Sequence, residues 1–143
     1  MRKDPEALLT KVLRENNYSV TSARKAVFAL LLRKEPQTMR QLIRAANGTV
    51  DRVSIYRAVE LFEKLGIAQR ITIGWKYKIE LSEVFLEHHH HINCLGCGKI
   101  VAVKEQPEIE ERIKQIARDS GFVLQSHQLE LQGLCATCQQ RVL

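Results

Sequence analysis

Apolar residues in the first half of the chain recur every three or four positions, the period of an amphipathic helix. Residues that suit helix N-caps precede three of these stretches, namely Thr21, Thr38 and Asp51. Pro36 and Gly66 stand where two of the stretches stop. The pattern therefore predicts helices at residues 5–17, between 21 and 36, at 39–46 and at 52–65.

Each predicted helix except the short third one carries an apolar stripe that we expect to be buried. The stripe is Leu8, Leu9, Val12 and Leu13 in the first helix and Ala23, Val27, Leu30 and Leu31 in the second. In the fourth it is Ile55, Ala58, Val59 and Phe62, and the residues expected at the surface are Arg52, Tyr56, Arg57, Glu60 and Lys64. The fourth helix thus combines a core face with a polar and largely basic face.

The third helix, the turn Asn47-Gly48-Thr49 and the fourth helix form a helix-turn-helix pattern. Arg52, Tyr56 and Arg57 lie in the N-terminal half of the second helix of this motif, where side chains reach base edges and phosphates. The alternative is an ordinary amphipathic helix with a solvated charged face.

A β-hairpin is predicted after the fourth helix. Residues 67–73 and 75–81 alternate between apolar and polar side chains, around the turn Thr72-Ile73-Gly74. A helix-turn-helix followed by a hairpin is the arrangement of a winged helix.

The second half predicts a β-β-α-β unit. Its expected elements are strands at 88–93 and 99–103, a helix at 107–120 and a long strand at 122–131. In the helix we expect Ile109, Ile113, Ile116 and Ala117 to be buried. The fold class is α+β, with domains at residues 1–82 and 88–143 and a hinge at 83–87.

Charge is unevenly distributed along the 143 residues. Residues 1–82 hold 16 Lys and Arg against 8 Asp and Glu, a net charge of +8, whereas residues 83–143 hold 6 against 8, a net charge of −2. This asymmetry favours a polyanion-binding first half joined to a regulatory second half. We find no apolar run of transmembrane length and no secretory signal, so we expect a cytoplasmic protein without a membrane partner.

The four cysteines form two Cys-x-x-Cys motifs, Cys94 with Cys97 and Cys135 with Cys138. Two thiolates at this spacing can bind one ion, and two such pairs complete the tetrahedral shell of structural zinc. Two disulfides or redox-active dithiols are the alternative, but a thioredoxin-like dithiol needs a βαβ setting around a single motif. We therefore predict a structural zinc site, which would also supply folding free energy to this small unit.

Four of the five histidines form the run from His88 to His91. Alternate residues of a strand share a face, so His88 and His90 should point one way and His89 and His91 the other. With Glu110 in the first turn of the helix and an inward-pointing His127, the first pair could complete a site for Zn, Fe(II), Mn or Co.

Simpler interpretations of these residues remain open. A single inward His127 is more often a hydrogen-bonded core residue, and Glu110 could simply complement the helix dipole. A run of four histidines could also be left from an affinity tag, although tags lie at termini and are usually longer.

These segments together resemble the ferric uptake regulator family of bacterial metal-dependent repressors, over nearly the whole chain. The matching segments are Val20-Thr21-Ser22-Ala23-Arg24, Val53-Ser54-Ile55-Tyr56-Arg57-Ala58-Val59, His88 through Lys99, and Leu134-Cys135-Ala136-Thr137-Cys138. The resemblance implies a winged-helix DNA-binding domain, a C-terminal dimerisation domain and a homodimer on palindromic double-stranded operators.

The resemblance also assigns roles to particular residues. Of the candidate DNA contacts, which are Arg24, Arg52, Ser54, Tyr56 and Arg57, the resemblance assigns DNA contact to the pair Tyr56 and Arg57. The four cysteines correspond to the structural zinc site, and the regulatory site of two strand histidines, a helix Glu and a late His is matched in full by His88, His90, Glu110 and His127.

The second regulatory site of the family is incomplete in this sequence. His89 and His91 are present with Glu80 as the acid, but no histidine precedes residue 88 and Ala102 stands where an acid can occur. Either an acid such as Glu35 or Glu83 substitutes, or sensing has moved to the complete site.

The function that we expect is a metal-responsive transcriptional repressor of metal-uptake or homeostasis genes, regulated by Fe²⁺, Zn²⁺ or Mn²⁺. A peroxide sensor of the same family is one alternative, which the incomplete second site disfavours. A zinc-dependent hydrolase is a remoter one, because four protein ligands would leave a catalytic zinc no open position. We therefore expect no enzymatic activity, no catalytic residues and no small-molecule substrate.

Overall fold

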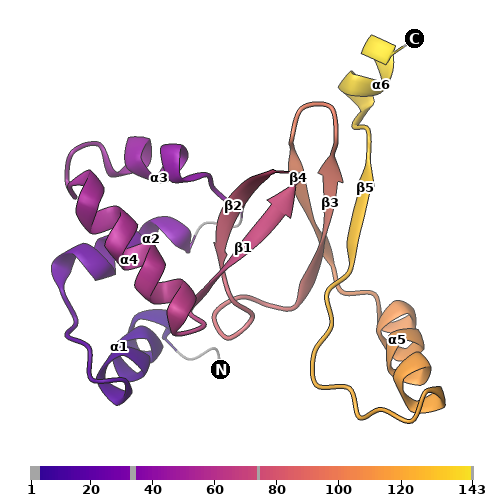
Figure 1. Ribbon diagram of the computed structural model, residues 1–143, viewed down its shortest axis with the longest axis horizontal. Coiled ribbons are helices and arrows are strands. Elements are labelled where there is room, and N and C mark those ends of the chain that lie inside the picture. Colours follow the sequence, from indigo (N-terminus) through magenta and orange to yellow (C-terminus); the bar gives the residue numbers. More distant parts are fainter. Residues whose placement is uncertain (1–3, 33–34, 74, 143) are drawn as a thin grey trace. The chain divides into compact units, whose positions relative to one another are not determined.

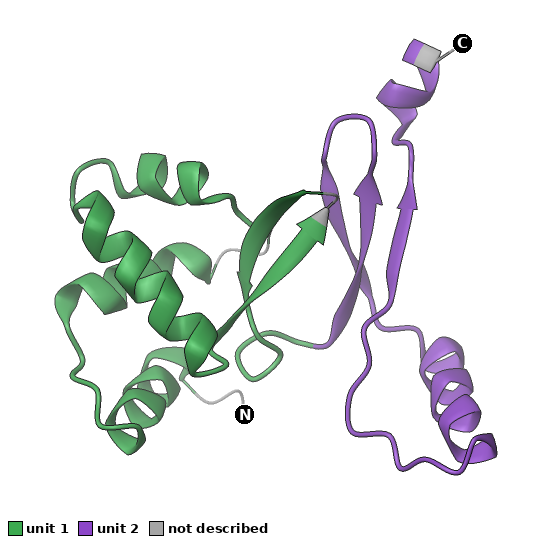
Figure 2. Ribbon diagram, viewed as in Figure 1, with its two compact units in different colours: residues 1–87 green, residues 88–143 purple. Residues whose placement is uncertain are grey.

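The computed structural model describes residues 4–32, 35–73 and 75–142. The chain divides into two compact units, residues 1–87 and 88–143, which are described separately (Figure 2). Unit 1 ends where the expected hinge at 83–87 ends, and within it Phe85 and Leu86 pack partly against the hydrophobic core. The hinge and the domain limits remain predictions.

Unit 1 consists of four helices followed by a hairpin (Figure 1). The elements are α1 (Pro5–Glu15), α2 (Ser22–Leu31), α3 (Met39–Ala46), α4 (Arg52–Lys64), β1 (Ala68–Ile73) and β2 (Lys76–Leu81). The two strands are antiparallel, with Ala68 paired to Leu81 and Ile73 to Lys76. The winged helix-turn-helix arrangement expected from the sequence is thus present, although Gly74 of the expected turn lies outside the described residues.

The predicted N-caps form as expected. The Thr21 hydroxyl accepts a hydrogen bond from the Arg24 backbone N–H, and Thr38 forms a reciprocal capping box with Gln41. The Asp51 carboxylate accepts a hydrogen bond from the Ser54 N–H at 2.9 Å. These bonds satisfy N–H groups that have no partner inside the helix, and this is why the helices begin at these positions.

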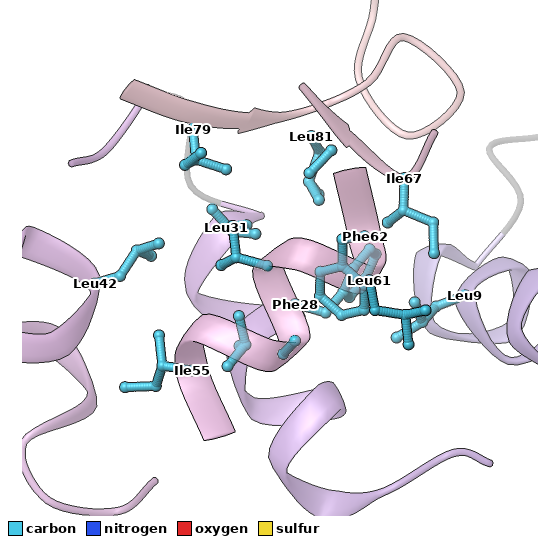
Figure 3. Packing of buried hydrophobic residues seen from close by; sticks show 14 of the residues in the cluster. Leu9, Phe28, Leu31, Leu42, Ile55, Leu61, Phe62, Ile67, Ile79 and Leu81 are labelled. Atoms are coloured by element: carbon cyan, nitrogen blue, oxygen red, sulfur yellow. The ribbon is translucent and has the colours of Figure 1, made fainter. Parts of the chain in front are cut away.

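The core of unit 1 lies between the helices and one face of the hairpin (Figure 3). The predicted stripe of α4 is buried throughout, but Ala23 and Leu30 of α2 are only partly buried. Sequence periodicity did not single out Phe28, which is fully buried and packs edge-to-face on Phe62 with ring centroids 6.4 Å apart. Its ring fills the space between α2 and α4, a position that only the packing of the two helices defines.

Unit 2 is a three-stranded sheet with two helices (Figure 1). The elements are β3 (His89–Cys94), β4 (Ile100–Lys104), α5 (Pro107–Asp119), β5 (Glu130–Gly133) and α6 (Ala136–Val142). The strand order is β4-β3-β5, with β3 antiparallel to β4 and parallel to β5. This is the predicted β-β-α-β order with a short C-terminal helix added.

Two predictions about unit 2 are wrong. The long strand at 122–131 is reduced to β5, and residues 122–129 have no regular structure because only the segment beside β3 finds backbone partners. The apolar stripe of α5 is not buried either, since Ile109 is 42% and Ile116 56% exposed. The buried residue of α5 is instead Glu110.

No helix in the described part of the chain combines the length and the apolar character that crossing a lipid bilayer requires.

Candidate metal and DNA-binding sites

The four cysteines converge at one end of the sheet in unit 2, where Figure 1 shows the β3–β4 turn close to the start of α6. Their Sγ atoms lie within 4.8 Å of one another, and those of Cys97 and Cys135 are 3.8 Å apart. Four sulfur atoms at the usual Zn–S distance of about 2.3 Å from a tetrahedral ion would be separated by about 3.8 Å. All four thiols are free, in contrast to the disulfide alternative. The cluster is therefore suited to zinc.

The protein environment separates the acidities of the clustered thiols. Backbone N–H groups, first that of Cys135 at 3.3 Å from the Cys94 sulfur and then that of Cys97, lower the pKa of Cys94 to about 6. Hydrogen bonds with Cys135 and Cys94 raise the pKa of Cys138 to about 12. One cysteine thus favours the thiolate, while a neighbour keeps its proton in hydrogen bonds with the surrounding sulfur atoms. A divalent cation would replace such protons, as zinc does when it binds thiolates.

A second cluster joins three separate segments of unit 2. His90 belongs to β3, His88 precedes it, Glu110 lies in the first turn of α5, and His127 lies in the segment before β5. The Nε2 atom of His88 is 3.2 Å from Nε2 of His127 and 3.4 Å from Oε1 of Glu110. Nε2 of His127 is 2.9 Å from Oε2 of Glu110, and His90 contacts the same carboxylate. Ligands at about 2.0–2.1 Å from a tetrahedral ion would be about 3.3 Å apart, so the group fits a metal ion.

Glu110 is unusual because its carboxylate is buried on a helix that is otherwise largely exposed. Burial by itself raises the pKa of Glu110, but the hydrogen bond to His90 and the charges of His127 and His88 outweigh it, and the pKa is lowered. The carboxylate is therefore held ionised among three imidazoles. A buried carboxylate needs such partners, so the interpretation of Glu110 as a simple helix-dipole residue does not account for its surroundings.

The other face of β3 carries His89 and His91. Their Nε2 atoms are 3.1 Å apart, as expected for alternate residues of one strand that share a face. The sheet register places Ala102 opposite His91, so β4 supplies no ligand there. Glu80 belongs to β2 of unit 1, and its place in this second site remains a prediction, as do substitutions by Glu35 or Glu83.

The expected DNA-binding residues of α4 lie at the surface. Arg52 and Arg57 are exposed, and Tyr56 is 47% exposed, whereas Ile55 of the same turn is fully buried. The Ser54 hydroxyl donates a hydrogen bond to the Asp51 carboxylate at 2.6 Å. Ser54 can therefore still accept a hydrogen bond but has its own proton engaged.

Arg24 has an intramolecular role in this structure. Its guanidinium donates a hydrogen bond to the Ser19 carbonyl at 2.6 Å and lies 5.7 Å from the centre of the Tyr18 ring. It thereby ties the start of α2 to the preceding loop. Its role as a DNA contact remains a prediction.

Sequence reasoning did not single out Gly96, which lies inside the first Cys-x-x-Cys motif. A Cβ atom at this position would lie 2.8 Å from the Cys138 sulfur and 2.9 Å from its Cβ. The cysteine spacing alone contains no indication of this, because the close approach comes from α6, some forty residues later in the chain.

Comparisons with known proteins agree with this architecture. The profile of the ferric uptake regulator family matches residues 15–132. The ferric uptake regulation protein of Campylobacter jejuni is 30% identical over 138 residues, which cover 92% of this chain and 86% of that protein.

Solved structures of similar proteins cover most of the chain. The Helicobacter pylori ferric uptake regulator, in which three functional metal binding sites were found, superposes with a TM-score of 0.79 at 26% identity and covers 97% of each chain. The Pseudomonas aeruginosa ferric uptake regulator with manganese gives a TM-score of 0.74 at 26% identity, covering 89% of this chain and 97% of that one.

Proposed function

Because this chain belongs to the ferric uptake regulator family, we propose that it is a metal-responsive repressor that binds palindromic operator DNA as a homodimer. The observation that supports this most directly is the convergence of three histidines and one buried carboxylate on a single point in unit 2. Such a group has the donor set of a regulatory metal site, and it occurs in the same chain as a basic winged helix.

We assign separate roles to the metal-ligand clusters. Cys94, Cys97, Cys135 and Cys138 would hold a structural zinc ion that joins β3, β5 and α6. His88, His90, Glu110 and His127 would hold the regulatory ion, for which Fe²⁺, Zn²⁺ or Mn²⁺ are the candidates. A bound cation supplies the positive charge that draws these ligands together.

The regulatory cluster can couple metal binding to structure because its members come from three segments that are separate in the chain. Glu110 is attached to α5, His127 to the irregular segment before β5, and His90 to the sheet. When these side chains converge on an ion, they select the arrangement of unit 2 that supports DNA binding. A ligand shifts such an equilibrium only by its difference in affinity for the two states, so loss of one side chain should weaken the response.

Dimerisation is supported by the apolar surface of unit 2. Ile109 and Ile116 of α5 and Phe122 and Val123 after it are exposed by between 42% and 83%. Large apolar side chains exposed together on one segment of the chain are more common at a protein–protein interface than on a free surface. A symmetric pair would present two recognition helices to successive major grooves, which matches a palindromic operator.

The decisive experiment is DNA binding titrated against metal. Purified protein is analysed for zinc, and its affinity for duplexes selected from a random pool is measured by fluorescence anisotropy with added Fe(II), Mn(II) or Zn(II). We expect tightly held zinc and an affinity that rises with one of the added metals. Affinity independent of every metal, or no duplex bound at all, would contradict the proposal.

The same assay identifies the sensing site. We expect His90→Ala to abolish the metal response and His91→Ala to retain most of it. Of the two histidine clusters among the described residues, the one with His90 has four candidate ligands within unit 2, whereas the one with His91 has two. The opposite result would assign sensing to the second site. Resistance of DNA binding by the iron-loaded protein to hydrogen peroxide would exclude the peroxide-sensor alternative.

A further inference from the structure

The turn between α3 and α4 contains an asparagine followed by a glycine, Asn47 and Gly48. Asparagine is a chemically labile residue, because its side-chain amide can react with the backbone nitrogen of the residue that follows it. A following side chain hinders that approach, and Gly48 has none. Both residues are exposed to solvent. Asn47 therefore combines a reactive neighbour with free access for water.

Backbone hydrogen bonds distinguish Asn47 from the other three asparagines of the chain, Asn16, Asn17 and Asn93. After each of those three, the next backbone N–H is engaged. The bonds are Asn17 N–H to the Arg14 carbonyl at 3.0 Å, Tyr18 N–H to the Leu13 carbonyl at 2.8 Å, and Cys94 N–H to the Lys99 carbonyl at 2.8 Å. The N–H of Gly48 has no hydrogen-bond partner among the residues that the structure describes. Of the four asparagines, Asn47 is thus the one with an unengaged nitrogen beside it.

Asn17 is the closest comparison within the chain. Asn17 and Asn47 are both exposed, both follow a helix, and both have a left-handed backbone, with φ of 63° and 48°. The next residue makes the difference, because Tyr18 packs partly against the hydrophobic core and its N–H is bonded. Exposure and backbone conformation are therefore matched, and the reactivity of the following nitrogen is not.

The position of Asn47 gives a change there a structural consequence. Asn47 ends α3, and its N–H donates to the Arg44 carbonyl at 3.1 Å. Two residues later the N–H and the hydroxyl of Thr49 both donate to the Ala46 carbonyl, at 2.9 Å and 2.5 Å. These bonds fix the path of the chain from α3 into α4, so an altered backbone at 47 would displace one helix of the motif from the other.

We propose that Asn47 is a site of spontaneous deamidation, which converts it to aspartate or isoaspartate and disrupts the turn of the helix-turn-helix. The Gly48 nitrogen gives up its proton to a solvent base and attacks Cγ of Asn47. The new C–N bond closes a succinimide ring, and the bond from Cγ to Nδ2 breaks as ammonia leaves with a proton from water. Water then opens the ring at either carbonyl, so no oxidant or enzyme is required.

The two products differ in their effect. Aspartate keeps the original backbone and adds one negative charge to a half of the chain whose net charge is +8. Isoaspartate carries the main chain through its former side chain, which inserts one additional carbon into the backbone at 47. The hydrogen bonds of Asn47 and Thr49 to the end of α3 cannot all be kept in that case. The isoaspartate form is therefore the one in which the turn is lost.

Ageing of the full-length zinc-loaded protein tests the chemistry. The protein is incubated in neutral and in mildly alkaline buffer, and peptide mass mapping follows each asparagine, with a protein isoaspartyl methyltransferase to identify isoaspartate. We expect conversion at Asn47, faster in the alkaline buffer because the attacking nitrogen must lose a proton. Conversion at Asn17 should be slower by roughly tenfold or more, since the hydrogen bond of Tyr18 must open first.

Hydrogen exchange and DNA binding measure the consequence. We expect the aged protein to lose protection at the N–H groups of Asn47 and Thr49 and to keep it in the core of unit 1. The isoaspartate form should also bind a selected duplex roughly tenfold more weakly than fresh protein, because a displaced motif misplaces the contacts of α4. This last measurement alone rests on the proposed function.

Two matched variants separate Asn47 from general ageing. Asn47→Gly removes the amide and keeps the left-handed backbone, which glycine adopts without strain, so its exchange pattern and affinity should not change with age. Asn17→Gly makes the same substitution at the other left-handed asparagine and should age as the wild type does.

Several outcomes would overturn the inference. Asn47 that stays intact, or that converts no faster than Asn17, would refute the assigned site. Conversion at Asn47 with unchanged exchange at Thr49 would refute the disruption of the turn, as would Asn47→Gly protein that loses protection as fast as the wild type. If fresh protein binds no duplex, the proposed function fails, and mass mapping and exchange still decide the inference.

Discussion

At the scale of single residues, the four-cysteine cluster depends on a position that bears no ligand. Gly96 lies between Cys94 and Cys97, and the sulfur of Cys138 approaches it to a distance that leaves no space for a Cβ atom. Real Cβ atoms do not come within 3.0 Å of a neighbour, so any side chain at 96 must displace Cys138. The sulfur geometry that suits zinc then changes with it.

We predict that Gly96→Ala lowers the zinc content and the zinc affinity of the protein. Gly133→Ala is the matched control, because it has no atom within 4 Å of the added Cβ and lies in the strand next to β3. Zinc is quantified by elemental analysis and by competition with a chromogenic chelator. Equal zinc retention in the two variants would show that Cys138 can move without cost.

The exposed side chains of α4 lead to a second residue-scale prediction. Arg57→Ala should weaken operator binding about tenfold or more, as loss of a bidentate base contact or a phosphate contact does, and leave the thermal melt unchanged because Arg57 is exposed. Lys11→Ala is the control of equal charge. Undiminished affinity in the anisotropy assay would remove Arg57 from the interface.

At the scale of elements, α3 shows how a short helix is maintained. With eight residues it is too short to be stable alone, so it depends on its cap and on the packing of Leu42 and Ala46. The capping box of Thr38 and Gln41 satisfies two backbone N–H groups at its start. The orientation of the helix-turn-helix therefore depends on the capped first turn of α3.

We predict that Thr38→Ala destabilises unit 1 by about 1 kcal/mol, the usual cost of losing such a cap. Thr38→Ser keeps the hydroxyl and should restore most of the loss. Urea denaturation followed by circular dichroism measures both. If the alanine variant unfolds at the wild-type midpoint, the capping box contributes nothing that solvent cannot replace.

At the scale of the whole molecule, metal binding and folding are coupled in unit 2. Its core is small, and its sheet, α6 and the β3–β4 turn meet at the cysteines rather than at a large apolar cluster. The hydrophobic cluster of buried residues lies entirely in unit 1. We therefore expect the stability of unit 2 to depend on bound metal and on the apolar surface of the proposed dimer partner.

We predict that Cys135→Ser, or removal of zinc by a strong chelator, unfolds unit 2 and leaves unit 1 folded. Structural zinc contributes on the order of 10 kcal/mol in small zinc modules, which exceeds what this core can replace. Hydrogen exchange should show protection lost after residue 88 and kept before it. Unchanged protection throughout would contradict the assigned role of the cluster.

The exposed stripe of α5 predicts the oligomeric state. Ile116→Asp should shift the protein from dimer to monomer, because a charge would be buried at the interface. Lys114→Asp places the same side chain on another exposed position of the same helix and should leave the dimer intact. Sedimentation velocity distinguishes the two, and a dimeric Ile116→Asp variant would place the interface elsewhere.

Local chemistry in the sequence determined much of this protein. N-caps, helical periodicity and the alternation of the hairpin predicted every element of unit 1 closely, because each depends on residues near it in the chain. The ligand groups could be proposed for the same reason, since Cys-x-x-Cys and alternating histidines are local spacings.

Only the tertiary structure decided the features that depend on distant parts of the chain. Periodicity identifies an apolar face of a helix but not what covers that face. The stripe of α5 was therefore expected in the core, but the structure leaves it exposed. Apolar alternation likewise predicted a strand at 122–131, but a strand forms only where a neighbour offers hydrogen bonds, and on this side β3 pairs only with residues 130–133. The close approach of Cys138 to Gly96 brings together residues far apart in sequence, and no local pattern records such a distance.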